Sequence, residues 1–315
     1  MPAMSNYLKM GCLAILPLLF LNISLQAQVN CSSKDGLRAC GLGDSHTLDY
    51  EIEPKEILFT TRSLWGNLTL PYDIEISPLT GSTFSLFSNS GEQLDINLTF
   101  RANDGEIQSL TPGNTSNFFT GTGDDAETYL IIELVTNQVP SSSSYSASFE
   151  MTLNNYFFIF NTGTETVAFD IVLNVEPNIV IRNLGDVNLG NSGTLFGQPI
   201  EDREDFCIGG KGFSSYTVNL SSINGSTGGN GNSAYELTGS NETISYAVAF
   251  SDNLASNTGI VPGNLGDVPG SFTRTTDEDC LVDNARVYIS IAPVDWQSAQ
   301  EPIYTDVLTV TVSSQ

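Results

Sequence analysis

The sequence predicts an all-β protein of two β-sandwich domains, of which the second lacks its closing strand. Apolar side chains alternate with polar ones over many short segments, and this period of two is that of half-buried strands. Turns rich in asparagine and glycine separate the segments, and no stretch of a dozen residues carries a helical stripe. Many short strands, in a chain long enough for two domains, favour two immunoglobulin-like sandwiches.

An internal repeat supports two domains. Four apolar positions of the first copy return in the second: Tyr145, Phe149, Met151 and Leu153 match Tyr304, Leu308, Val310 and Val312. Upstream, residues 94–100 match residues 244–250. The first copy continues into two further apolar segments, 156–160 and 167–175, whereas only three residues follow Val312. We therefore expect the second sandwich to expose an open core and an unpaired strand edge that another chain fills.

Residues 1–27 have the features of a signal peptide. Lys9 supplies the positive charge, residues 13–23 the apolar stretch, and Leu25-Gln26-Ala27 the cleavage site, so the mature chain is expected to be exported. Two domains follow, 28–177 and 178–315. We place their boundary at Pro177 because proline cannot donate to a strand ladder and suits the first position of a strand.

The mature chain retains four cysteines, an even number that suggests two disulfides in an exported protein. Proximity in the sequence favours the pairs Cys31–Cys40 and Cys207–Cys280. A single histidine and the absence of a Cys-x-x-Cys motif argue against a metal site, and we expect no cofactor.

The net charge of −25 reflects a scarcity of basic residues. Lysine and arginine neutralise phosphates in nucleic-acid complexes, so this composition excludes nucleic-acid binding and disfavours docking to anionic lipid. The charge is expected to keep the exported protein soluble.

Catalytic groups are few. His46 lies beside Ser45, but the chain has no Gly-x-Ser-x-Gly motif to build a hydrolase site around them. The carboxylate pairs Asp124-Asp125 and Glu201-Asp202 lack the spacing of an EF-hand, although a calcium site of another kind stays open. We expect no enzymatic activity.

Several apolar residues interrupt polar turns of the N-terminal domain. Phe118-Phe119 lies between two polar segments, Trp65 and Leu68 flank Gly66-Asn67, and Val139 precedes a serine run. Exposed apolar residues often mark binding sites, so Phe118, Phe119, Trp65 and Val139 are candidate surface contacts. The alternative for the two phenylalanines is a strand end folded into the core. The continuous apolar run 156–160 predicts a buried strand.

Residues 178–315 resemble the spore-coat-protein-U domain of archaic chaperone–usher pili. The matching segments are 183–190, 216–220, 244–248 and 303–312, together with Cys207 and Cys280. The terminal segment 303–312 is the most distinctive of these. The N-terminal half matches more weakly, through the repeat. Two domains with an incomplete pilin-like domain last are similar to the tip adhesin of such pili.

The resemblance implies a non-enzymatic adhesin at the tip of a bacterial surface pilus. Its expected partners are a periplasmic chaperone, an outer-membrane usher, an adjacent pilin subunit and an unknown surface or receptor. The edge that takes the donor strand would carry Tyr304, Leu308, Val310 and Val312. Residues 28–49 show little apolar alternation, so this chain offers no donor strand of its own and fits a fibre end. The alternative is a secreted β-sandwich protein that binds carbohydrate or acts on glycans.

Overall fold

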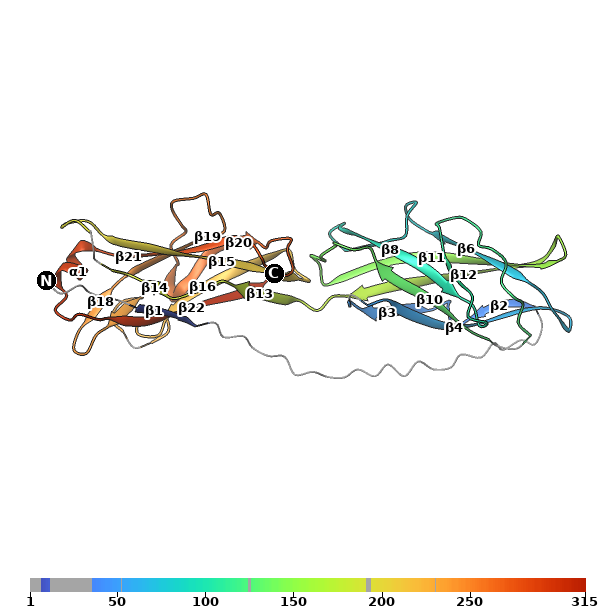
Figure 1. Cartoon of the computed structure of the whole chain (residues 1–315), viewed down its shortest axis with the longest axis horizontal. Helices are drawn as coiled ribbons and strands as arrows, with labels where there is room; N and C mark the ends of the chain where they lie inside the picture. Colours follow the sequence, from blue (N-terminus) through green and yellow to red (C-terminus); the bar gives the residue numbers. More distant parts are fainter. Residues whose placement is uncertain (1–6, 12–35, 52, 124–125, 191–193, 230) are drawn as a thin grey trace. The chain divides into compact units, whose positions relative to one another are not determined.

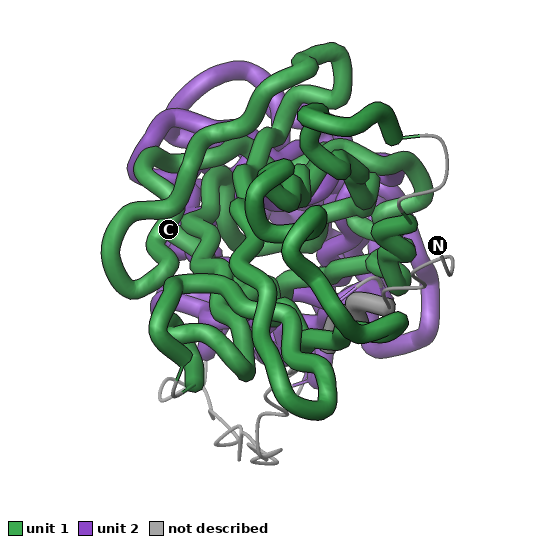
Figure 2. Tube along the Cα trace, turned by 90° about the vertical axis from the view of Figure 1, so that its left-hand side faces the viewer, with its two compact units in different colours: residues 1–19, 177–315 green, residues 20–176 purple. Residues whose placement is uncertain are grey.

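The computed structural model describes residues 7–11, 36–51, 53–123, 126–190, 194–229 and 231–315 (Figure 1). The chain divides into two compact units (Figure 2): an N-terminal unit of residues 20–176, and a C-terminal unit of residues 177–315 that also includes the strand at residues 7–11. Strands dominate both units, so the all-β prediction is confirmed. Among the residues described, no helix is long and apolar enough to cross a lipid bilayer.

The N-terminal unit is a sandwich of two sheet layers. One layer has the strand order β2-β4-β10-β8, the other β6-β11-β12-β3, and β7 pairs with both β8 and β11 and so joins them. The strands are β2 (Leu37–Cys40), β3 (Ser45–Asp49), β4 (Lys55–Trp65), β5 (Leu68–Thr69), β6 (Tyr72–Pro78), β7 (Ser85–Phe87), β8 (Gln93–Arg101), β9 (Ile107–Ser109), β10 (Ala126–Leu134), β11 (Ser144–Phe157) and β12 (Phe160–Asn174).

Alternation along the strands places one side chain in two between the layers. Phe59 of β4 and Phe100 of β8 lie 6.1 Å apart between ring centroids, and Phe149 of β11 and Phe169 of β12 lie 5.6 Å apart. All four rings belong to one continuous apolar core. Aromatic pairs at these distances stabilise a core beyond the area that they bury.

The C-terminal unit is also a two-layer sandwich, with the strand orders β14-β1-β22-β16-β20 and β13-β15-β21-β19. Its own apolar core lies between the layers. Its elements are β1 (Tyr7–Gly11), β13 (Asn178–Arg182), β14 (Val187–Asn188), β15 (Ile200–Lys211), β16 (Ser215–Ser222), β17 (Glu236–Thr238), β18 (Thr243–Ser245), β19 (Ala247–Ser251), the 3₁₀ turn η1 (Asn264–Gly266), β20 (Asp267–Thr273), β21 (Ala285–Ile291), α1 (Pro293–Ser298) and β22 (Thr305–Ser314).

The repeat extends over a whole layer of each unit. The layer β6-β11-β12-β3 corresponds strand by strand to β16-β22-β1-β14, because β11 and β22 carry the matched apolar positions. In the first layer β12 follows β11 through a hairpin and runs antiparallel to it. In the second layer β1, from the other end of the chain, takes the place of β12 and runs parallel to β22.

A tyrosine at the start of the repeated strand has the same role in both units. The Tyr145 hydroxyl accepts hydrogen bonds from the backbone N–H groups of Ser141 and Ser142, each at 2.9 Å. The Tyr304 hydroxyl accepts from the backbone N–H groups of residues 300 and 301, at 3.1 and 2.9 Å. This arrangement is the tyrosine corner of immunoglobulin-like sandwiches. Its recurrence shows that the two strands are equivalent in structure as well as in sequence.

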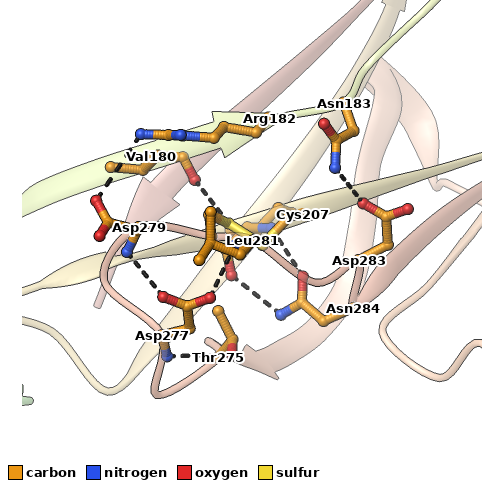
Figure 3. The surroundings of a disulfide bond; sticks show 12 residues. Val180, Arg182, Asn183, Cys207, Thr275, Asp277, Asp279, Leu281, Asp283 and Asn284 are labelled. Carbon is orange, nitrogen blue, oxygen red and sulfur yellow. Dashed lines mark hydrogen bonds and ion pairs between the residues drawn. A yellow bond between two sulfur atoms is a disulfide. The ribbon is translucent and has the colours of Figure 1, made fainter.

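The predicted disulfide between Cys207 and Cys280 is present (Figure 3). It joins β15 to the loop 275–284, in which the Asp277 carboxylate accepts the backbone N–H of Leu281 at 2.7 Å. Cys40 is also disulfide-bonded, and Cys31, its predicted partner, lies outside the described residues. The covalent link therefore fastens a long loop to the sheet of the C-terminal unit.

The predicted signal peptide and the predicted open edge meet in β1. The strand lies within residues 1–27, and the remainder of that segment is outside the described residues. In the whole chain the edge of β22 is therefore paired over part of its length, where the sequence predicts an unpaired edge.

Candidate functional site

The hairpin between β11 and β12 ends in a turn made of large apolar residues. Phe158 and Ile159 form the turn, and Phe158 has a φ of 56°, a left-handed conformation that is rare for a bulky side chain. Two-residue hairpin turns ordinarily use glycine, asparagine or aspartate at such positions. Phe158, Ile159 and Phe160 are 83%, 85% and 68% exposed. The turn thus keeps apolar side chains in water in a strained conformation.

Neighbouring loops add aromatic rings to this turn. Trp65, at the end of β4, lies 5.5 Å from Phe157 between ring centroids, and Phe118 packs edge-on against Tyr156 at 5.0 Å. Leu68 follows Trp65 after the tight turn at residues 66–67 and is half exposed. We call this set the aromatic tip; its residues are Trp65, Leu68, Phe118, Tyr156, Phe157, Phe158, Ile159 and Phe160.

Polar side chains hold the hairpin beneath the aromatic tip. The Asn154 side-chain oxygen accepts hydrogen bonds from the Thr164 hydroxyl at 2.8 Å and from the Asn161 amide at 3.2 Å. The Thr162 hydroxyl donates to the Asn155 side-chain oxygen at 3.0 Å. The pairing shifts by one residue between Asn155 and Tyr156, and such irregularities re-aim the side chains that follow. The hairpin end is therefore positioned by a bonded network.

The four residues predicted as surface contacts differ in exposure and in place. Trp65 and Phe118 belong to the aromatic tip and are 56% and 57% exposed. The prediction for Phe119 is wrong: it is 1% exposed because its ring packs 4.8 Å from Phe100 in the core. Val139 is half-buried in the loop after β10, near the start of β11, and so lies at the other end of the unit from the hairpin turn.

The sequence predicts a buried strand over residues 156–160, and this prediction is wrong for residues 158–160: Phe158 and Ile159 form the turn, and Phe160, at the start of β12, is exposed. Their apolar run contains no glycine or asparagine to mark a turn, and the turn signal at Asn161-Thr162-Gly163 lies within β12. The signal available in the sequence was the Asn154-Asn155 pair before the run, which is polar where a buried strand would be apolar.

A second site lies in the C-terminal unit, between β14 and β22. We call the position that β1 occupies there the strand slot. Tyr7 pairs with Asn188 of β14 on one side and with Thr305 of β22 on the other. Pairing with β22 ends at Thr309, and among the described strands none pairs with residues 310–314 on this edge. A strand twice as long as β1 would be accommodated along β22.

The four residues predicted to line the slot edge alternate toward the core of the unit. Tyr304, Leu308 and Val310 are buried, and Val312 is half-buried against the same core. The matched residues of β11 belong to the core of the N-terminal unit, where β12 pairs alongside β11 in the same sheet. The slot is therefore the position beside β22 that corresponds to β12 in the first copy of the repeat.

A buried carboxylate lies on the same strand. Asp306 accepts hydrogen bonds from the Ser222 hydroxyl at 2.6 Å and from the Tyr246 hydroxyl at 2.5 Å. Burial, and then the nearby Asp306, raise the pKa of Tyr246 above its usual range. Asn224 donates its backbone N–H to Asp306 at 3.2 Å, so this network ties the loop after β16 to the beginning of β22.

The structure describes some of the residues that the sequence offered as candidate catalytic groups. His46 lies in β3, and its Nε2 donates to the Leu42 carbonyl at 2.9 Å. Asp124 and Asp125 lie outside the described residues, and Glu201 and Asp202 lie in β15. Over the described ranges no group of three or more metal-ligating side chains converges.

No protein-family model and no curated protein sequence matches the chain. Among the solved structures to which the chain is similar is the CsuC–CsuE chaperone–tip adhesion subunit pre-assembly complex, from the archaic chaperone–usher Csu pili of Acinetobacter baumannii. The sequence identity is 14% and the TM-score 0.43, and the alignment covers 86% of this chain and 97% of the other. The CupB6 tip adhesin of Pseudomonas aeruginosa aligns at 10% identity and a TM-score of 0.38, over 98% of both chains. CfaE, the adhesive subunit of the CFA/I fimbria of enterotoxigenic Escherichia coli, aligns at 13% identity and a TM-score of 0.33, over 86% and 98%.

Proposed function

We propose that this protein is a non-enzymatic adhesin at the end of a bacterial surface fibre and that the aromatic tip is its contact surface. The observation that carries the proposal is the hairpin turn of Phe158 and Ile159. A folding requirement does not explain it, since asparagine or glycine would form the turn without strain. Strained, exposed apolar residues held by a bonded network are expected where they bind something.

The chemistry of the aromatic tip favours an apolar surface. Residues 154–164 contain no charged side chain, although the whole protein carries a net charge of −25. Binding through this end therefore avoids bringing the acidic body against a negatively charged surface. Burial of apolar area contributes roughly 25 cal/mol per Å², so the three residues 158–160 together supply several kcal/mol before the costs of association. Many fibres on one cell would multiply this by avidity.

The strand slot supports the second half of the proposal, which concerns assembly. We infer that the mature chain, without residues 1–27, receives a strand there from a periplasmic chaperone and later from the adjacent subunit, with an outer-membrane usher guiding export. Main-chain hydrogen bonds give such strand addition its affinity, and alternate side chains give it specificity. The disulfide between Cys207 and Cys280 fits an oxidising, exported environment.

Attachment of fibre-bearing cells to polystyrene tests the aromatic tip. Phe158, Ile159 and Phe160 are changed together to serine, and assembly of fibres is checked first. The matched control changes two exposed apolar residues at the other end of the same unit, Leu79→Ser and Val135→Ser. We expect the tip variant to lose at least ten-fold in attachment and the control variant to keep it.

Unchanged attachment of the tip variant would contradict the proposal. A carbohydrate-binding protein, the alternative function, would instead bind glycan-coated beads in preference to polystyrene and would be displaced by free sugar. Because aromatic rings also stack on sugars, the assay compares glycan-coated beads with uncoated polystyrene beads.

A further inference from the structure

The C-terminal unit exposes a second group of apolar side chains, distinct from its strand slot. Leu195 and Phe196, in the loop between β14 and β15, are 74% and 87% exposed, and Val294 on α1 is 73% exposed. The Trp296 indole donates to the Gln198 carbonyl at 2.9 Å and so ties this loop to α1. Ile303, shortly after α1, is half exposed. We call Leu195, Phe196, Val294 and Ile303 the end patch.

The end patch lies at the end of the unit where β22 begins. α1 connects β21 to the segment 299–304, which leads directly into Thr305. On the other side, the loop of Leu195 and Phe196 leaves β14 after Asn188, which pairs with Tyr7 opposite Thr305. The end patch therefore adjoins the Thr305 end of the strand slot.

The N-terminal unit indicates which way a natural strand would run through the slot. There β12 runs antiparallel to β11, so that Asn174, at the end of β12, pairs with Ser144, at the start of β11. A partner strand with the direction of β12 would leave the slot at Thr305. By contrast, β1 runs parallel, and its last residue, Gly11, leaves opposite Thr309, inside the slot.

We propose that the end patch is the docking surface for the folded body of the subunit whose N-terminal strand fills the slot. This rests on the proposed strand acceptance. A strand that leaves the slot at Thr305 places the rest of its chain at the end of the C-terminal unit that carries the end patch. The exposed apolar side chains of the end patch could be buried there. The segments 190–200 and 292–304 carry Asp295 and Glu301 and no basic residue. The partner's face is therefore apolar with a neutral or basic rim.

Photo-crosslinking in cells that assemble complete fibres tests this contact. Phe196 is replaced by p-benzoylphenylalanine in the full chain, and Thr311, an exposed residue of β22 beyond the reach of β1, is replaced in a second variant. The product at Thr311 identifies the protein that fills the slot. We expect Phe196 to capture the same protein, through a peptide outside its N-terminal strand.

Leu281 provides the control position. It is 70% exposed in the loop held by the disulfide (Figure 3), which is bonded to the Lys211 end of β15 rather than to its Ile200 end. We expect no product with that partner from Leu281.

The outcomes separate the two proposals. No product at Thr311 would overturn strand acceptance. A Thr311 product with no Phe196 product, or with a different protein at Phe196, would overturn the end patch alone. As a functional check, Leu195→Ser with Phe196→Ser should lower the adhesin retained on sheared fibres at least ten-fold, whereas Leu281→Ser should leave it unchanged. Full retention by the double variant would also contradict the docking surface.

Discussion

The repeat permits a stringent test of the strand slot, in which the missing strand is supplied from the first copy. Tyr156 of β11 corresponds to Gln315, so residues 157–175 are appended directly after Gln315, with Asn-Gly in place of Phe158-Ile159. The host is the mature chain 28–315, which lacks β1. The appended segment then has the hairpin geometry of β11 and β12, and we expect it to occupy the slot.

The size of the effect follows from the burial of this segment in the N-terminal unit. Phe169 and Leu173 are 3% and 5% exposed there. A matched control carries serine at these two positions of the appended copy, so that the entropy of ordering the segment is common to both variants. Burying a large apolar side chain is worth about 1.5–3 kcal/mol, which makes the expected difference about 3–6 kcal/mol. This is a large share of the 5–15 kcal/mol typical of a whole domain.

The two tryptophans allow each unit to be followed separately. Trp65 belongs to the N-terminal unit and Trp296 packs against the core of the C-terminal unit, so Trp65→Phe leaves a reporter for the second alone. We expect the urea midpoint of Trp296 emission to lie about 2 M higher with the apolar strand than with the serine control. Equal midpoints would refute the reasoning, as would a chain 28–315 that unfolds cooperatively at the same midpoint without any added strand.

Three further predictions concern stability. Phe119→Ala should destabilise the N-terminal unit by about 3–5 kcal/mol and Phe118→Ala by less than about 1 kcal/mol, because Phe119 is buried and Phe118 is exposed. Chemical denaturation measures both variants, and equal losses of stability would contradict the placement of Phe119 in the core. Changing Cys207 and Cys280 together to serine removes a cross-link spanning 73 residues and should cost about 4 kcal/mol, read from thermal unfolding; an unchanged midpoint would count against it. Burial raises the pKa of Tyr72 to about 12, so the neutral phenol is favoured in the folded state. The free energy of unfolding should therefore fall as the pH rises from about 10 to 12. Tyr72→Phe should reduce that fall, as measured by urea titrations at each pH.

Alternation in the sequence was sufficient to predict the strands, since burial on one face imposes the same period wherever a sheet covers a core. Residues 94–100 form β8 as predicted, but the matching segment 244–250 is split into β18 and β19 at Tyr246, because its two halves pair in different sheets. Which sheet a segment joins depends on distant strands and leaves no local mark.

The candidate sites were predictable only in part. Trp65 and Phe118 could be recognised because large apolar residues stood within polar turns. Phe158 and Ile159 had only the Asn154-Asn155 pair before them as a signal, since a turn without glycine, asparagine or aspartate looks like the strand on either side of it. The occupant of the slot was also beyond local reasoning, because β1 pairs with residues at the opposite end of the sequence.

The two-residue connection between β11 and β12 has a kinetic consequence. In the N-terminal unit the hairpin holds the closing strand, β12, at a very high effective concentration beside β11. A strand from the far end of the chain, such as β1, must close a loop of nearly the whole protein, which costs about 4 kcal/mol more in chain entropy than a short turn. A strand from another molecule must arrive by diffusion. The N-terminal unit should therefore complete its fold early and unaided, while the rate at which the C-terminal unit finishes folding is governed by the supply of its partner.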